Sequence, residues 1–184
     1  MALGYLVNDN ASFSLARIGE EILSNAFQHI GQLKSLRGMA NSIIGLRQFV
    51  QFNHPDDIRK QMVVDLANKI VQMYNDNKQE NWHWFEPVLA YDNAIMPLAL
   101  LHAYELTGEK KYLKIATESM GFLESIVFHD NILRPVGNHG WMKRGGEPAQ
   151  LDKQGIDAMA MVLYYQQAFK LSGERKHRSK LLQS

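Results

Sequence analysis

A repeated helix ending constrains the fold of this chain more than any other feature. Residues 103–109 read Ala-Tyr-Glu-Leu-Thr-Gly-Glu, and residues 168–174, 65 positions later, read Ala-Phe-Lys-Leu-Ser-Gly-Glu. In both copies an apolar helix ends on an aromatic residue, Leu and a hydroxyl residue. The Gly that follows suits a left-handed helix end, and the Glu suits the start of the next helix. Repeats of this kind predict stacked antiparallel helical hairpins.

Hydrophobic periodicity predicts helices along nearly the whole chain. We expect them at residues 12–30, 35–52, 54–74, 92–107, 109–128 and 154–172, with a short seventh helix possible in the tail. The helices at 92–107 and 154–172 are apolar almost all round, so neighbours must cover them, whereas the helix at 109–128 carries a one-sided stripe and can face water. The alternation predicts an all-α protein with inner and outer helices: one domain over residues 1–174, then a basic tail at 175–184.

The segment from residue 130 to residue 153 interrupts this pattern. It begins with a turn and a short extended piece, and it continues as a loop rich in glycine and polar residues. A loop of about twenty residues is uncommon inside a compact helical domain and is often functional.

Composition narrows the classes of function. The chain has 184 residues, an apolar share of 46% and a net charge of +1 from mixed basic and acidic residues. This balance gives no argument for a nucleic-acid groove. There is no cysteine, hence no disulfide framework, and there is neither a signal-peptide pattern nor an apolar run long enough to span a membrane. We expect a cytoplasmic protein.

Residues 82–94, Trp-His-Trp-Phe-Glu-Pro-Val-Leu-Ala-Tyr-Asp-Asn-Ala, place aromatic rings and two carboxylates at the mouth of an apolar helix. Aromatic rings stack on the apolar face of a pyranose, and carboxylates bind its hydroxyls or transfer protons. The alternative is a buried loop in which Asp92 only caps the helix and Glu86 binds backbone amides.

This stretch, followed by Pro97, residues 99–101 and residues 104–108, resembles the (α/α)-toroid domains of carbohydrate-active proteins. A second similar segment is Gln150, Asp152, Gln154 and residues 157–158, which lead into a helix. The resemblance covers about residues 35–174. The chain is most similar to the helical toroid domains attached to, or encoded beside, bacterial glycosyltransferases. It is more distantly similar to the six-hairpin glycosidases and to sugar epimerases.

The resemblance implies an inner ring of helices whose preceding loops line a sugar-binding cleft. A complete six-hairpin toroid needs roughly twice this length. The chain therefore resembles a partial toroid, or a subunit that completes one with a glycosyltransferase domain or a second copy. The competing hypothesis is a non-catalytic helical interaction module with an apolar face covered by a partner.

The predicted site combines both loops. If the protein is an enzyme, Glu86 and Asp92 are the predicted acid and base of glycoside chemistry. The predicted substrate-binding residues are Trp84, Asn93, His139, Trp141, Arg144, Gln154 and Asp157. For the tryptophans core packing is an equal alternative, and for Asp157 a favourable place near a helix N-terminus is the alternative. No ligand spacing supports a metal site, and no motif indicates a cofactor.

Overall fold

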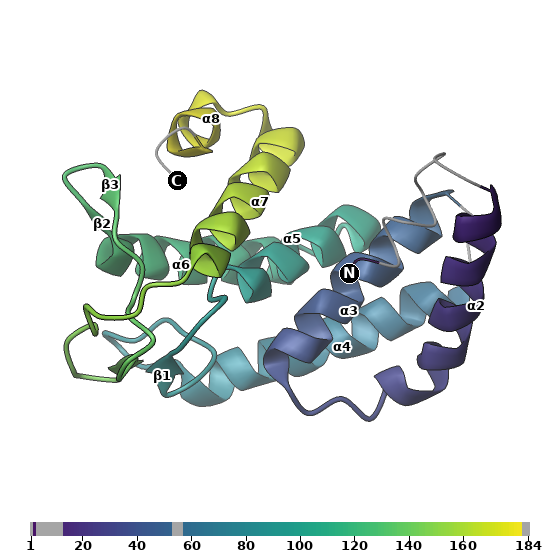
Figure 1. The fold of residues 1–184 in the computed structure, drawn as a ribbon, viewed down its shortest axis with the longest axis horizontal. Coiled ribbons are helices and arrows are strands. Elements are labelled where there is room, and N and C mark those ends of the chain that lie inside the picture. Colours follow the sequence, from purple (N-terminus) through teal and green to yellow (C-terminus); the bar gives the residue numbers. More distant parts are fainter. Residues whose placement is uncertain (1, 3–12, 53–56, 182–184) are drawn as a thin grey trace.

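The computed structural model describes residue 2, residues 13–52 and residues 57–181, and the fold over this part of the chain is mostly helical (Figure 1). This confirms the all-α class. The described helices are α2 (Phe13–Ile30), α3 (Leu36–Phe52), α4 (Asp57–Asn77), α5 (Ile95–Thr107), α6 (Lys110–Val127), α7 (Gly155–Ser172) and α8 (Arg175–Leu181).

Helix α5 lies at the centre of the array and contacts α3, α4, α6 and α7 (Figure 1). Helices α3, α5 and α7 run in the same direction, because polar contacts join their N-terminal ends and a second set joins their C-terminal ends. The nine residues from Ile95 to Ala103 are all buried. This confirms that the all-round apolar helix is covered by neighbours on every side.

The repeated helix endings have the same structure in both copies. Gly108 and Gly173 adopt the left-handed conformation, with φ of 73° and 68°, and their amides donate to the carbonyl four residues earlier. The amides of Glu109 and Glu174 donate to the side-chain hydroxyls two residues earlier, those of Thr107 and Ser172, each at 3.2 Å. The shared sequence pattern therefore encodes the same hairpin turn twice.

Two predicted helix boundaries need correction. Helix α5 begins at Ile95 rather than at Asp92, and its N-cap residue is Ala94 with no side-chain cap. Asp92 has a φ of 49°, so it belongs to a left-handed turn before the helix. Helix α4 extends to Asn77, beyond the predicted end at residue 74. The predicted start signal covers residues 54–57; residues 54–56 lie outside the described part of the chain, and Asp57 is the first residue of α4.

The segment from residue 130 to residue 153 is tied down by two short antiparallel ladders. Strand β2 (Phe128–His129) pairs with β3 (Ile132–Leu133) in a hairpin. Strand β4 (Met142–Lys143) pairs with β1 (Val88–Leu89), with Leu89 opposite Met142. The second pairing attaches the long loop to the aromatic and acidic stretch at residues 82–94, which lies 50 residues earlier in the chain.

The outer edge of α7 differs from the covered surface of α5. Met159 and Phe169 expose 45% and 38% of their surface, although the opposite side of α7 is buried. The predicted short seventh helix is present as α8, which packs on α7. None of the described helices is long and apolar enough to cross a bilayer.

Candidate functional site

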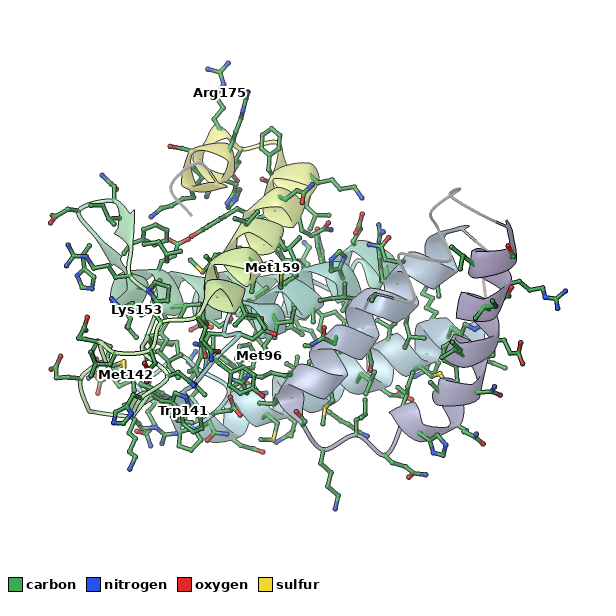
Figure 2. The ribbon with its side chains drawn as sticks, viewed as in Figure 1. Met96, Trp141, Met142, Lys153, Met159 and Arg175 are labelled. Atoms are coloured by element: carbon green, nitrogen blue, oxygen red, sulfur yellow. The ribbon has the colours of Figure 1, made fainter. Side chains whose placement is uncertain are left out.

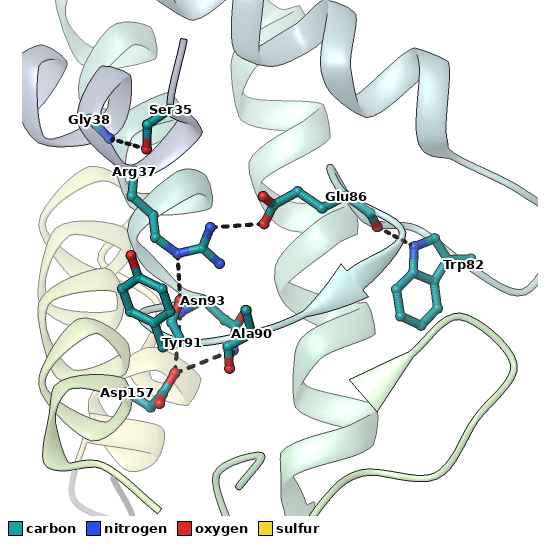
Figure 3. Close-up of polar contacts among 9 residues, drawn as sticks. All are labelled: Ser35, Arg37, Gly38, Trp82, Glu86, Ala90, Tyr91, Asn93 and Asp157. Carbon is teal, nitrogen blue, oxygen red and sulfur yellow. Dashed lines mark hydrogen bonds and ion pairs between the residues drawn. The ribbon is translucent and has the colours of Figure 1, made fainter. Parts of the chain in front are cut away.

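Polar side chains from α3, from the loop before α5 and from α7 meet where these three helices begin (Figure 3). We call this group the N-terminal polar cluster. Its members come from the start of α3, from the loop before α5 and from the first turn of α7: Arg37, Glu86, Asp92, Asn93 and Asp157. The cluster joins segments that lie up to 120 residues apart in the chain.

Arg37 binds the loop before α5 in three ways. Its Nε donates to the carbonyl of Tyr91 at 2.6 Å, and its Nη1 lies 2.9 Å from Oε2 of Glu86. Its guanidinium also lies 4.6 Å from the centroid of the Tyr91 ring. Ser35 accepts a bond from the amide of Gly38 at 3.3 Å, which fixes the first turn of α3 and so the base of the arginine.

Asn93 and Asp157 join α5 to α7. The backbone amide and the side-chain amide of Asn93 donate to the same oxygen of Asp157, at 3.2 and 3.3 Å. The side-chain amide also donates to the carbonyl of Ala90 at 3.3 Å. Because both side chains are buried, these bonds fix the turn that contains Asp92.

Three buried polar atoms of this cluster have no hydrogen-bond partner within the described part of the chain. They are Nη2 of Arg37, Oδ1 of Asp92 and Oδ1 of Asn93. A buried polar atom without a partner costs about 1–3 kcal/mol, so such atoms are rare in structures and need an explanation. Together they are one donor and two acceptors that no group of the described residues satisfies.

The pKa values of Asp92 and Asp157 are both raised above the ordinary value of an aspartate. Burial raises the pKa of Asp92 to about 6, where the nearby charge of Arg37 opposes the rise and that of Asp157 adds to it. Burial also raises the pKa of Asp157, against the hydrogen bonds from Asn93. A carboxyl with a pKa near neutrality is suited to proton transfer.

A second polar group, which we call the C-terminal polar cluster, joins the same three helices near their other ends. Its centre is Glu105 on α5. The oxygens of Glu105 lie 2.5 Å from Nη2 of Arg47, 2.7 Å from Nε2 of Gln167 and 3.0 Å from Nζ of Lys170. Nδ1 of His102 lies 3.6 Å away. Burial alone would raise the pKa of Glu105, but these donors lower it to about 2.

The predicted stacking role of Trp84 conflicts with its place in the structure. Trp84 has no exposed surface and packs edge-on against Phe85, with 5.2 Å between the ring centroids. Trp82 is also buried, and its indole donates to the carbonyl of Glu86 at 2.7 Å. Both tryptophan rings belong to the apolar core beneath the loop, so neither is exposed for stacking on a sugar.

The remaining predicted residues lie outside the N-terminal polar cluster. Arg144 packs against the Trp82 ring, at 5.9 Å from its centroid. His139 and Trp141 are exposed in the long loop, and the ring nitrogen of His139 lies 3.8 Å from Asp152. Gln154 is exposed at the N-cap of α7, where its side chain makes no cap bond.

Sequence reasoning identified four members of the cluster and missed Arg37 and Tyr91 as site residues. Tyr91 exposes 42% of its surface and covers the arginine. The signal for Tyr91 was its place beside Asp92 in the aromatic and acidic stretch. Arg37 carries no comparable signal, because an arginine in the first turn of a helix is ordinarily a surface residue.

No family model, curated protein or solved structure matches this chain in our comparisons. Over the described residues, no group of three or more histidine, aspartate or glutamate side chains could hold a metal ion. The chemistry of the two polar clusters and of the loops beside them therefore has to indicate the function.

Proposed function

We propose that the N-terminal polar cluster binds a sugar, and that the protein is a carbohydrate-active or carbohydrate-binding helical protein associated with glycosyltransfer. The observation that carries this proposal is the set of three unpartnered buried atoms on Arg37, Asp92 and Asn93, next to the exposed ring of Tyr91. The resemblance of residues 82–94 to toroid domains of carbohydrate-active proteins supports the same conclusion.

A sugar ring matches this combination of groups. Each hydroxyl of a pyranose both donates and accepts a hydrogen bond, so neighbouring hydroxyls can take a bond from Nη2 of Arg37 and give bonds to Asp92 and Asn93. Tyr91 supplies an aromatic surface at the edge of the same cluster. Sites of this kind combine an aromatic surface with a few fixed polar groups.

The two carboxylates have different tasks in a catalytic version of this proposal. Asp92 is the proton donor, because burial raises its pKa to about 6 and leaves about a tenth of the molecules protonated at pH 7, far more than for an ordinary aspartate. Glu86 is the second carboxylate, held by Arg37 at the more exposed side of the cluster. A rate that falls as Asp92 loses its proton is the expected pH profile.

Titration with sugars tests the binding proposal. We would titrate the protein calorimetrically with mono-, di-, tri- and hexasaccharides of glucose, mannose, galactose and N-acetylglucosamine. We expect binding by the unmodified chain and a loss of at least about tenfold, or 1.4 kcal/mol, in Asp92→Asn. Asp76→Asn is the matched control, because Asp76 lies exposed on α4. Absence of binding to every sugar in this panel would contradict the proposal.

The second candidate is a helical interaction module that completes a larger toroid with a glycosyltransferase domain or a second copy. The observation favouring it is the edge of α7 at Met159 and Phe169, which is exposed although the sequence predicts that neighbours cover this helix, in contrast to residues 95–103 of α5, which are all buried. An apolar helix edge of this kind is expected to pack against another helix. Light scattering tests association between copies: a dimer that dissociates in Phe169→Lys supports it, and a monomer at all concentrations contradicts it.

A further inference from the structure

We propose that Trp141 is a second aromatic platform, and that the ligand of the N-terminal polar cluster is an oligosaccharide chain rather than a single sugar. This inference rests on the proposed function and specifies its substrate class. Figure 2 labels Trp141 beside Met142, in the long loop between α6 and α7.

The backbone of Trp141 is the first observation. Its φ is 56°, in the left-handed region that favours glycine, and a bulky residue is seldom found there. Residues held in such conformations cluster at ligand sites. Trp141 also exposes 40% of its surface. Burial in the core therefore does not account for a large aromatic side chain at this position.

The loop around Trp141 is built to hold the ring in place. The indole N–H donates to Oδ1 of Asn138 at 2.7 Å. The amide of Trp141 donates to Gly137 at 3.2 Å, and its carbonyl accepts from Ala149 at 3.0 Å. Gly137 permits this closure, because a Cβ there would lie 2.2 Å from the carbonyl oxygen of Leu151.

The short ladder between β1 and β4 brings this ring towards the cluster. Leu89 pairs with Met142, so Tyr91 follows the ladder by two residues and Trp141 precedes it by one. Tyr91 and Trp141 therefore lie just beyond the same end of the ladder. Their Cα atoms can be no more than about 16 Å apart, from the spacing of residues along and between strands. A short oligosaccharide can reach both rings.

The exposed surface of the Trp141 ring agrees with a sugar ligand. The indole N–H is already used by Asn138, which leaves the apolar face of the ring as the exposed surface it offers. Stacking on a sugar ring needs only that face.

Affinity for a sugar series of increasing length tests the inference. The titration panel is the one above, from monosaccharides to hexasaccharides, with Trp141→Gly and Trp141→Ala as variants. Trp141→Gly is informative because glycine relieves the left-handed conformation and so should keep the fold stable. The matched control is Phe169→Ala, which removes an equally exposed aromatic ring from α7.

We expect the unmodified chain to bind tri- and hexasaccharides at least about tenfold more tightly than the corresponding monosaccharide. Both Trp141 variants should remove this gain and leave monosaccharide affinity unchanged, while Phe169→Ala keeps the gain. Equal affinity for all lengths, or a gain that persists in Trp141→Gly, would overturn the inference while sugar binding itself stands. If no sugar binds at all, the proposed function fails, and this inference fails with it.

Discussion

The two polar clusters that join α3, α5 and α7 use similar residues in opposite ways. At the C-terminal ends, the carboxylate of Glu105 accepts hydrogen bonds from the side chains of Arg47, Gln167 and Lys170, at 2.5 to 3.0 Å. At the N-terminal ends, an arginine and two aspartates are also brought together, yet Asp92 keeps a buried oxygen without a partner in the described chain.

The difference separates a structural network from a candidate binding site. Donors lower the pKa of Glu105 to about 2, whereas burial raises the pKa of Asp92 to about 6. A buried polar network adds to stability when its members are satisfied, and it costs stability when they are not. In the C-terminal polar cluster both oxygens of Glu105 are paired and join α3, α5 and α7, although Nδ1 of His102 has no hydrogen-bond partner within the described residues. In the N-terminal polar cluster one oxygen of the Asp92 carboxylate itself is unpaired.

Removing the charge of Glu105 should have the largest effect on stability. Glu105→Gln leaves the buried guanidinium of Arg47 without its carboxylate, and breaking a buried ion pair in this way costs about 3–5 kcal/mol. Urea denaturation measures the free energy of unfolding. Lys170→Gln is the control, since Lys170 is more than half exposed and its loss should cost less than about 1 kcal/mol. Equal effects of the two changes would break the comparison.

Removing Arg37 should have a smaller effect on folding. Arg37→Gln removes a bond to the Tyr91 carbonyl and an ion pair with the partly exposed Glu86. We expect a loss of about 1–2 kcal/mol in the free energy of unfolding. Sugar affinity should fall by at least about tenfold in the same variant. A loss of stability as large as that of Glu105→Gln would show that Arg37, like Glu105, serves to hold the helices together.

The pH dependence of stability should have opposite signs at the two clusters. The raised pKa of Asp92 means that the folded state binds more protons between about pH 4 and 6, so stability falls as pH rises through that window. Glu105 has a lowered pKa, so its contribution is present above its ordinary value and is lost as pH falls towards 2. Denaturation of Asp92→Asn and Glu105→Gln from pH 3 to pH 7 measures both trends, and parallel curves for the two variants would contradict this assignment.

The sequence predicted the helices well because periodicity and helix-end residues are local signals. The paired endings at Gly108 and Gly173 share both their pattern and their hydrogen bonds. The pairing of β1 with β4 is two residues long and joins segments that are distant in the chain. No local sequence pattern therefore predicts it. Asp92 was misplaced for a related reason, since its left-handed turn depends on contacts with α3 and α7.

The site was predicted in part. The stretch at residues 82–94 indicated Glu86, Asp92 and Asn93, and the place of Asp157 near a helix start indicated their partner on α7. Arg37 and Trp84 show the limit of such reasoning. Whether an arginine turns inward, or a tryptophan is covered, is decided by how the helices pack, and composition along the chain does not contain that information.

The most direct test of the central claim is the Asp92→Asn variant, measured for stability and sugar affinity at pH 7. If Asp92 is kept ionisable and buried for a ligand, the amide should leave the free energy of unfolding unchanged or higher, because a buried charge is removed. Affinity for the best-bound sugar should fall at least about tenfold. A variant that unfolds more easily and binds that sugar as tightly as the unmodified chain would contradict the account.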